Sequence, residues 1–177
     1  MGNAMFRDLR ADEIECRAAL VKENGLSLLL YKDARVDQNI LDETVGPMNW
    51  QRSHTRDNAN CIVSIWDERK GQWIDKEDTD TESNTEALKG LASDSFKRAC
   101  FNWGIGRELY TSPFIWIKAD KCNIYEDRGK PRCKDTFAVE KIVIENKTIK
   151  ALSILNESTG KRCYAWMAPG WAPPEVK

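Results

Sequence analysis

Residues 82–110 constrain the fold more than any other stretch, because they carry the start, the body and the end of one helix. Ser83 and Glu86 have the spacing of a capping box, in which each side chain accepts a hydrogen bond from a backbone N–H at the helix start. Gly104 suits a left-handed cap at the other end. Between them, small and apolar residues recur at three- and four-residue steps and share one stripe of a helical wheel: Leu88, Leu91, Ala92, Ser95, Phe96, Ala99 and Trp103. We therefore predict a helix over residues 84–103, roughly 30 Å long, whose stripe faces a core.

Two adjacent cations lie off this stripe, Lys97 opposite it and Arg98 on its flank. On an arbitrary helix such residues form a solvated face, here paired with Asp94 at the i+3 and i+4 positions. The alternative is that both cations bind phosphate groups. The helix pattern alone leaves both interpretations open.

Three strands are predicted before the helix, over residues 50–56, 61–66 and 72–77. These segments are rich in Ile, Val and Trp, and the segments between them, 57–60 and 67–71, are rich in residues that favour turns. Together with the helix they give a β-β-β-α arrangement.

The chain before these strands is predicted to form three smaller elements. Residues 12–18 are predicted as a short helix, and Asn24-Gly25 as the turn of a hairpin. Asp33 is placed to cap a further helix, which Gly46-Pro47 ends.

Beyond the main helix the pattern is less regular. Residues 114–118 are predicted as a strand and residues 118–134 as a charged, mobile connection. Two segments rich in Ile and Val, 137–145 and 148–155, flank a turn and predict a second hairpin, with a third short strand over residues 162–166.

The fold class that these elements predict is α+β: an antiparallel β-meander followed by a long helix, with an additional C-terminal β-hairpin. A chain of 177 residues suits one domain, which we place at residues 5–167 and follow with an irregular tail over residues 168–177. Residues 1–4 are interpreted as a remnant of expression and are left out of the fold.

The residue types that catalysis or metal binding needs are scarce. The carboxylates of residues 75–82 resemble a metal-dependent nuclease site in composition. We interpret them instead as residues that precede a helix start, where the helix dipole stabilises acidic side chains. Residues 104–106 end a helix, whereas a phosphate loop begins one. His54 is the only histidine, and no CxxC pair occurs among the six cysteines, at positions 16, 61, 100, 122, 133 and 163. We therefore expect reduced thiols, no metal site, no catalytic residue, no cofactor and no enzymatic activity.

The distribution of charge is uneven along the chain. The net charge of −1 argues mildly against nucleic acid, since Lys and Arg supply most non-specific affinity for it. Residues 67–86 hold eight acidic and three basic residues, however, whereas residues 118–134 hold six basic and three acidic ones. Opposite faces are therefore expected to differ in sign. No apolar run has the length of a membrane span and no signal peptide is visible, so we expect a cytoplasmic protein with no membrane partner.

One motif resembles a known family. The sequence Ser-Asp-Ser-Phe-Lys-Arg-Ala at residues 93–99, followed by Trp-Gly-Ile-Gly-Arg at 103–107 and Leu-Tyr at 109–110, is similar to the signature helix of the Rad-fifty-two superfamily of single-strand annealing proteins, in particular its phage Sak-like branch. The similarity covers residues 31–116 and extends more loosely to about residue 166. It implies the same β-β-β-α arrangement.

The resemblance also implies a function. It points to an ATP-independent protein that binds single-stranded DNA along a homo-oligomeric ring or filament and anneals complementary strands in phage homologous recombination and DNA repair. Such a protein would work in the bacterial cytoplasm, at or near the nucleoid. Its candidate partners, besides DNA, are a single-stranded DNA-binding protein or an exonuclease of the host or phage.

The DNA-binding residues that the resemblance implies lie on the two predicted helices. Lys97 and Arg98 match the family's basic pair, and Arg35 matches the position of another family contact. A further basic residue that some relatives carry after this pair has no counterpart, because this chain has Cys100 and Phe101 there.

Three more arginines, Arg52, Arg56 and Arg107, are added because hairpin or loop positions beside the main helix could extend a DNA groove. Two other functions stay open. The chain could bind and protect single-stranded DNA ends without annealing them, or it could be a structural or interaction protein that binds no DNA, which the near-neutral charge favours.

Overall fold

The computed structural model describes residues 6–80 and 87–175. The described residues fall into two compact units. The first unit comprises residues 6–8 and 33–107, and the second comprises residues 9–32 and 108–175. The second unit is therefore built from two separate parts of the chain. The assignment of residues 5–167 to one domain stays a prediction.

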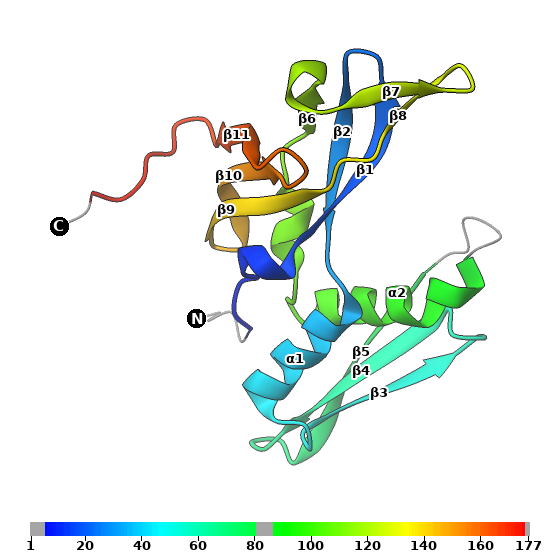
Figure 1. Ribbon diagram of the computed structural model, residues 1–177. Helices are drawn as coiled ribbons and strands as arrows, with labels where there is room; N and C mark the ends of the chain where they lie inside the picture. The colour runs from blue at the N-terminus through cyan, green and yellow to red at the C-terminus, as the bar shows by residue number, and fades with distance from the viewer. Residues whose placement is uncertain (1–5, 81–86, 176–177) are drawn as a thin grey trace. The chain divides into compact units, whose positions relative to one another are not determined.

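The first unit is an antiparallel β-meander covered by helices. Its strands pair in the order β3-β4-β5, and both helices lie against one face of this sheet, as Figure 1 shows. The elements are α1 (Ala34–Val45), β3 (Trp50–Thr55), β4 (Asn60–Asp67), β5 (Gln72–Thr79) and α2 (Ala87–Asn102). The predicted meander followed by a helix is confirmed.

Local chemistry sets both ends of α1. Asp33 precedes the helix with an extended backbone, and its carboxylate accepts a 2.7 Å hydrogen bond from the N–H of Arg35. Gly46 follows the helix with φ of +85°, in the left-handed region that favours glycine. The start and the stop predicted for this helix are therefore confirmed.

The stripe of α2 forms the core of the first unit together with β4. Phe96, Ala99 and Ser95 are fully buried on the helix, and Leu91 is nearly so. Alternate residues of β4, the strand against which α2 packs, are buried as well: Cys61, Val63 and Ile65. The helix period of 3.6 and the strand period of two thus meet at one apolar layer.

The main helix ends one residue earlier than the sequence predicts. The structure describes α2 over 16 residues, Ala87–Asn102, whereas a long helix over residues 84–103 is predicted, of which residues 84–86 lie outside the described part of the chain. The N–H groups of Trp103 and Gly104 bond to carbonyls three residues earlier, at distances of 3.0 and 2.9 Å. These bonds tighten the last turn and end the α-helix before Trp103. Gly104 then takes the predicted left-handed conformation, with φ of +100°.

Two predictions fall outside the described residues. One is the capping box of Ser83 and Glu86, and the other is the expression remnant at residues 1–4.

The second unit is a six-stranded antiparallel sheet with the strand order β11-β10-β9-β1-β2-β6. Its strands are β1 (Glu15–Lys22), β2 (Gly25–Tyr31), β6 (Ile115–Lys118), β9 (Phe137–Glu145), β10 (Thr148–Asn156) and β11 (Lys161–Met167). The Tyr164 hydroxyl of β11 donates to the carbonyl of Phe114, just before β6, at 3.5 Å. The two edges of the sheet therefore approach each other and nearly close it.

The C-terminal hairpin is present, but the prediction that it is an addition to the fold is wrong. The strands β9 and β10 do pair as a hairpin, and β11 adds to β10 as predicted. The hairpin is not a separate addition, however, because β9 also pairs with β1, where Glu15 lies opposite Ala138. The hairpin predicted around Asn24-Gly25 is confirmed by the pairing of β1 with β2, but its two turn residues are Glu23 and Asn24, because Gly25 already pairs with Lys22.

Two local predictions in the second unit are wrong. Residues 12–18 are not a helix: a short 3₁₀-helix, η1 (Ala11–Glu13), leads directly into β1. Pairing of β1 with neighbours on both sides outweighs the weak helical preference of this segment. Residues 118–134 are not an irregular connection either, since they hold η3 (Ala119–Lys121) and a hairpin of β7 (Ile124–Asp127) with β8 (Lys130–Cys133).

The turn of this hairpin explains why it was missed. Arg128 and Gly129 both have positive φ, 51° and 76°, which is the two-residue turn that suits the twist of paired strands. The Arg-Gly pair is a weaker sequence signal for this turn than Asn-Gly or Asp-Gly, because arginine adopts positive φ less readily.

No helix among the residues that the structure describes is long and apolar enough to cross a membrane. No disulfide joins the cysteines at positions 16, 61, 100, 122, 133 and 163, all of which lie in the described part of the chain.

Phe96 supplies the first prediction. Phe96→Ala should lower the free energy of unfolding by about 3–5 kcal/mol, because it removes a fully buried ring from the layer between α2 and the sheet. Urea denaturation measures this change. Lys97→Ala, at the next position but outside the buried stripe, is the matched control and should change the value by only about 0.5 kcal/mol. Equal losses in the two variants would contradict the packing described.

Asp135 ties the segment before β7 to β10. Its Oδ2 accepts hydrogen bonds from the N–H of Asn123 at 2.8 Å and from the amide of the fully buried Asn156 at 2.9 Å. Burial raises the pKa of Asp135, but the hydrogen bonds from Asn156 and Asn123 outweigh it, so the pKa lies below its usual range.

The lowered pKa of Asp135 predicts an acid dependence of stability. Ionised Asp135 stabilises the fold above the usual carboxyl pKa of about 4, and this contribution is lost as pH falls through the lowered folded-state pKa. Asp135→Asn should therefore flatten the fall in the free energy of unfolding on acidification, measured by urea denaturation at a series of pH values. Asp127→Asn, in the exposed hairpin, is the control. An unchanged acid dependence in Asp135→Asn would rule out this role.

Candidate nucleic-acid interface

The six residues predicted to bind DNA all belong to the first unit. They come from α1, β3, the turn after β3, α2 and the start of the 3₁₀-helix η2 (Arg107–Thr111): Arg35, Arg52, Arg56, Lys97, Arg98 and Arg107. The environment of each differs, and it decides whether the cation is available to a ligand.

Lys97 and Arg98 form ion pairs with two different aspartates. Lys97 Nζ lies 3.0 Å from Oδ1 of Asp94, one turn earlier on α2, and its side chain is 28% exposed. Arg98 does not share this partner but reaches across to β5, where its Nε lies 3.5 Å from Oδ1 of Asp78. The predicted pairing with Asp94 is therefore confirmed for Lys97, while Arg98 pairs with Asp78 instead.

These ion pairs are partly solvated, which limits their strength. Ion pairs in contact with water contribute only about 0–1 kcal/mol. A phosphate oxygen could therefore replace Asp94 as the partner of Lys97, or Asp78 as the partner of Arg98, with little loss of stability. In the absence of such a ligand, the aspartates hold both cations in defined positions on α2.

Arg52 lies beside α2, on β3, which is an edge strand of the meander. Its guanidinium stands 4.6 Å from the centre of the Phe96 ring, in cation–π contact. The Trp50 ring, two residues earlier on the same side of the strand, stacks on Phe96 at 6.0 Å. Arg98 reaches β5 at the other edge of the meander. A cation therefore lies along each flank of α2, Arg52 on the side of β3 and Arg98 on the side of β5.

Arg56 is an exposed cation in a turn that is fastened to α2. It begins a run of three residues with positive φ, Arg56, Asp57 and Asn58. The carbonyl of Asn58 accepts a 2.8 Å hydrogen bond from the hydroxyl of Ser95 on α2. Arg56 itself forms no ion pair with any described residue, so its charge is available.

Arg35 is similarly available, at the first turn of α1. Its side chain is 87% exposed, and its Nε lies 3.8 Å from the cap residue Asp33. This long, solvated ion pair restrains the guanidinium weakly.

Arg107 has a structural role that the sequence did not suggest. Its guanidinium donates hydrogen bonds of 2.8 and 2.9 Å to the carbonyls of Phe101 and Asn102, at the end of α2. The last carbonyls of a helix lack partners within it, and a cation there also suits the helix dipole. Arg107 therefore caps the C-terminus of α2.

One further cation, Lys76 of β5, was missed. Its Nζ lies 5.1 Å from the centre of the Trp103 ring, at the end of α2. The register pairs Lys76 with the buried Val63 of β4, so it stands on the helix-facing side of the sheet. Alternation of residues along β5 from Ile74 was the available sequence signal.

The acidic run on β5 is engaged in hydrogen bonds. Asp75 accepts from the Ser64 hydroxyl at 2.6 Å, and Glu77 accepts from the Asn60 amide at 2.8 Å. Within residues 6–80 and 87–175, no group of three or more Asp, Glu, His or Cys side chains has a geometry that could hold a metal ion.

Comparison of the chain with protein-family models, curated proteins and solved structures found no match.

The capping role of Arg107 is testable through stability. Arg107→Ala should lower the free energy of unfolding by about 1.5–3 kcal/mol, because it removes two charge-assisted hydrogen bonds from the end of α2. Arg56→Ala, which removes an exposed arginine without such bonds, should change it by only about 0.5 kcal/mol. Chemical denaturation of both variants gives the comparison, and similar values for the two would argue against a cap.

Proposed function

We propose that this chain binds single-stranded DNA and anneals complementary strands without ATP, in homologous recombination and DNA repair, as a protein of the Rad-fifty-two type. One observation carries the proposal. The helix α2 is fastened to a β-meander by a buried stripe, and it bears Lys97 and Arg98 outside that stripe, with Arg52 alongside.

Annealing requires a grip on phosphates and free base edges. Lys97 and Arg98 would contact the phosphate backbone of one strand, and such contacts carry no sequence information. The bases would remain open to the incoming strand. Pairing of complementary bases then drives the reaction, so neither a catalytic acid or base nor ATP is needed.

Affinity would come from repetition of this surface. The α2 surface of one subunit offers few cations to a DNA strand, and the net charge of −1 on the chain opposes association with DNA. A homo-oligomeric ring or filament would present the α2 pair many times along one strand, and linked weak contacts add up to strong binding. An oligomer is therefore part of the proposal, as are a single-stranded DNA-binding protein or an exonuclease as further partners.

A second candidate function has one observation in its favour. Lys97 and Arg98 are both paired with aspartates, as they would be on a solvated helix face of a structural or interaction protein that binds no DNA.

The proposal predicts that the parent protein anneals complementary labelled oligonucleotides without nucleotide. Replacing Lys97 and Arg98 together by Ala should weaken binding of oligothymidylate and slow annealing. It should also lower the slope of log affinity against log salt by roughly 0.7 for each lost phosphate contact. Fluorescence anisotropy and a fluorescence annealing assay measure these changes.

Lys70→Ala is the matched control. Lys70, in the turn after β4, also forms an i,i+3 ion pair, in its case with Asp67 at the end of that strand. Its affinity and salt slope should remain those of the parent. A parent protein that binds but does not anneal would point to end protection, and one that does not bind would leave the structural role. Folded Lys97 and Arg98 variants that bind as the parent does would exclude the α2 surface.

A further inference from the structure

The hairpin of β7 and β8 has two chemically different faces. Residues opposite each other in an antiparallel pair point to the same side, and successive residues alternate. Tyr125 lies opposite Arg132, and Asp127 lies opposite Lys130, so these four share one face. Lys134 lies on this face too, because its Nζ stands 5.3 Å from the centre of the Tyr125 ring. We call Tyr125, Asp127, Lys130, Arg132 and Lys134 the basic face, because its three cations outnumber its one carboxylate.

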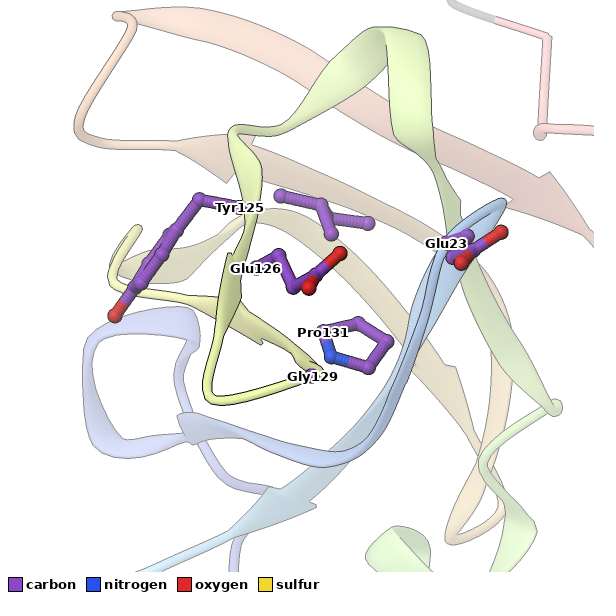
Figure 2. A pocket seen from close by; sticks show the side chains of 6 residues that line it. Glu23, Tyr125, Glu126, Gly129 and Pro131 are labelled. Carbon is purple, nitrogen blue, oxygen red and sulfur yellow. The ribbon is translucent and has the colours of Figure 1, made fainter.

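The other face of the hairpin is acidic and apolar. Ile124, Glu126 and Pro131 line an open pocket together with Glu23, from the turn between β1 and β2. Figure 2 shows Glu126 and Pro131 on the side toward Glu23, with the ring of Tyr125 on the opposite side of the strand. The register therefore places Glu126 on the face away from Tyr125 and Arg132, whereas Asp127 stays on the face of the cations, opposite Lys130.

The cations of the basic face are not held in ion pairs in the described part of the chain, although Asp127 lies opposite Lys130. Lys130, Arg132 and Lys134 are exposed, and no ion pair joins them to any acidic residue within residues 6–80 and 87–175. Lys97 and Arg98 of α2 differ, since each has an aspartate nearby. Alternate residues of a strand stand about 7 Å apart, so the three charges form a regular row.

Tyr125 adds an aromatic surface to this row. The side chain is 40% exposed, and the ring is flanked by Lys134 and lies opposite Arg132. Cations that follow a phosphate backbone, combined with aromatic rings on which bases stack, are typical of proteins that bind single-stranded nucleic acid. A surface for an acidic peptide would need the cations but not the ring.

The hairpin is held in place at its base. Asp135 accepts hydrogen bonds from Asn123, just before β7, and from Asn156 of β10. A preformed surface loses less conformational entropy on binding than a mobile loop does.

We propose that the basic face of the β7–β8 hairpin is a second binding surface for a single-stranded polynucleotide. Lys130, Arg132 and Lys134 contact successive phosphates, and one base stacks on Tyr125. The inference rests on the proposed function for its ligand, but it uses different residues in the other unit, so the two surfaces can be tested separately.

The test compares charge removal at the hairpin with equal charge removal elsewhere in the second unit. The variant K130A/R132A/K134A should bind labelled oligothymidylate more weakly than the parent, with a salt slope lower by about 2, because three phosphate contacts are lost. The control K22A/K141A/K161A removes three exposed lysines of the large sheet and should keep the slope of the parent. Thermal unfolding checks that both remain folded.

Tyr125 gives a test that does not depend on charge. Tyr125→Leu should weaken binding about tenfold through loss of base stacking, whereas Tyr125→Phe should bind as the parent does. Ultraviolet crosslinking of a bromouracil-substituted oligonucleotide should label the peptide that contains Tyr125.

The outcomes separate this inference from the proposed function. Normal binding by the hairpin variants, with loss of binding by the Lys97 and Arg98 variant, would overturn the second surface and leave the proposed function intact. Loss by the hairpin variants alone would support the second surface and exclude the α2 surface. If polyglutamate displaced the oligonucleotide from the parent as well as oligothymidylate does, the basic face would be a site for acidic protein, and the inference would be wrong. A parent that binds no oligonucleotide would overturn both.

Discussion

The burial of Phe96 between α2 and β3 sets the direction of the charges in the first unit. Its ring stacks on Trp50 and lies beneath the guanidinium of Arg52. Successive residues of a helix are about 100° apart, so a fully buried Phe96 leaves Lys97 and Arg98 on or beside the exposed side of α2. The proposed DNA contacts therefore depend on a buried apolar contact. The cap that Arg107 forms at the end of α2 stabilises the same helix.

The two surfaces proposed for nucleic acid keep their cations available in different ways. On α2, each cation rests against an aspartate in a solvated ion pair, and a ligand would exchange one oxygen partner for another. On the β7–β8 hairpin, strand alternation places Glu126 on the face away from Arg132, and Lys130, Arg132 and Lys134 form no ion pair with an acidic residue that the structure describes. A chain with a net charge of −1 can in this way present local surfaces of positive charge.

The second unit is built from two parts of the chain that are far apart in sequence. The six-stranded sheet combines β1 and β2 with strands that follow residue 107, and β1 meets β9 through a single pair, Glu15 with Ala138. The meander and α2 lie between these two parts in sequence. Each unit is dominated by hairpins between consecutive strands, which form from local contacts. The pairings of β1 with β9 and of β2 with β6 are the steps that require distant parts of the chain to meet.

Sequence reasoning alone was enough to predict the elements whose signals are local. The stripe of α2, the cap at Asp33, and the turns between β3, β4 and β5 depend on residues within a few positions of one another, and the structure has them close to where they were predicted. It also determined that Lys97 stands off the buried stripe. Three features became evident only in the folded protein: Arg98 pairs with Asp78, Arg107 caps α2, and the C-terminal hairpin is part of a six-stranded sheet. These depend on which distant strand edge or carbonyl lies within reach, because pairing across a sheet and capping by an arginine are set by position in space, and no spacing in the sequence encodes that position.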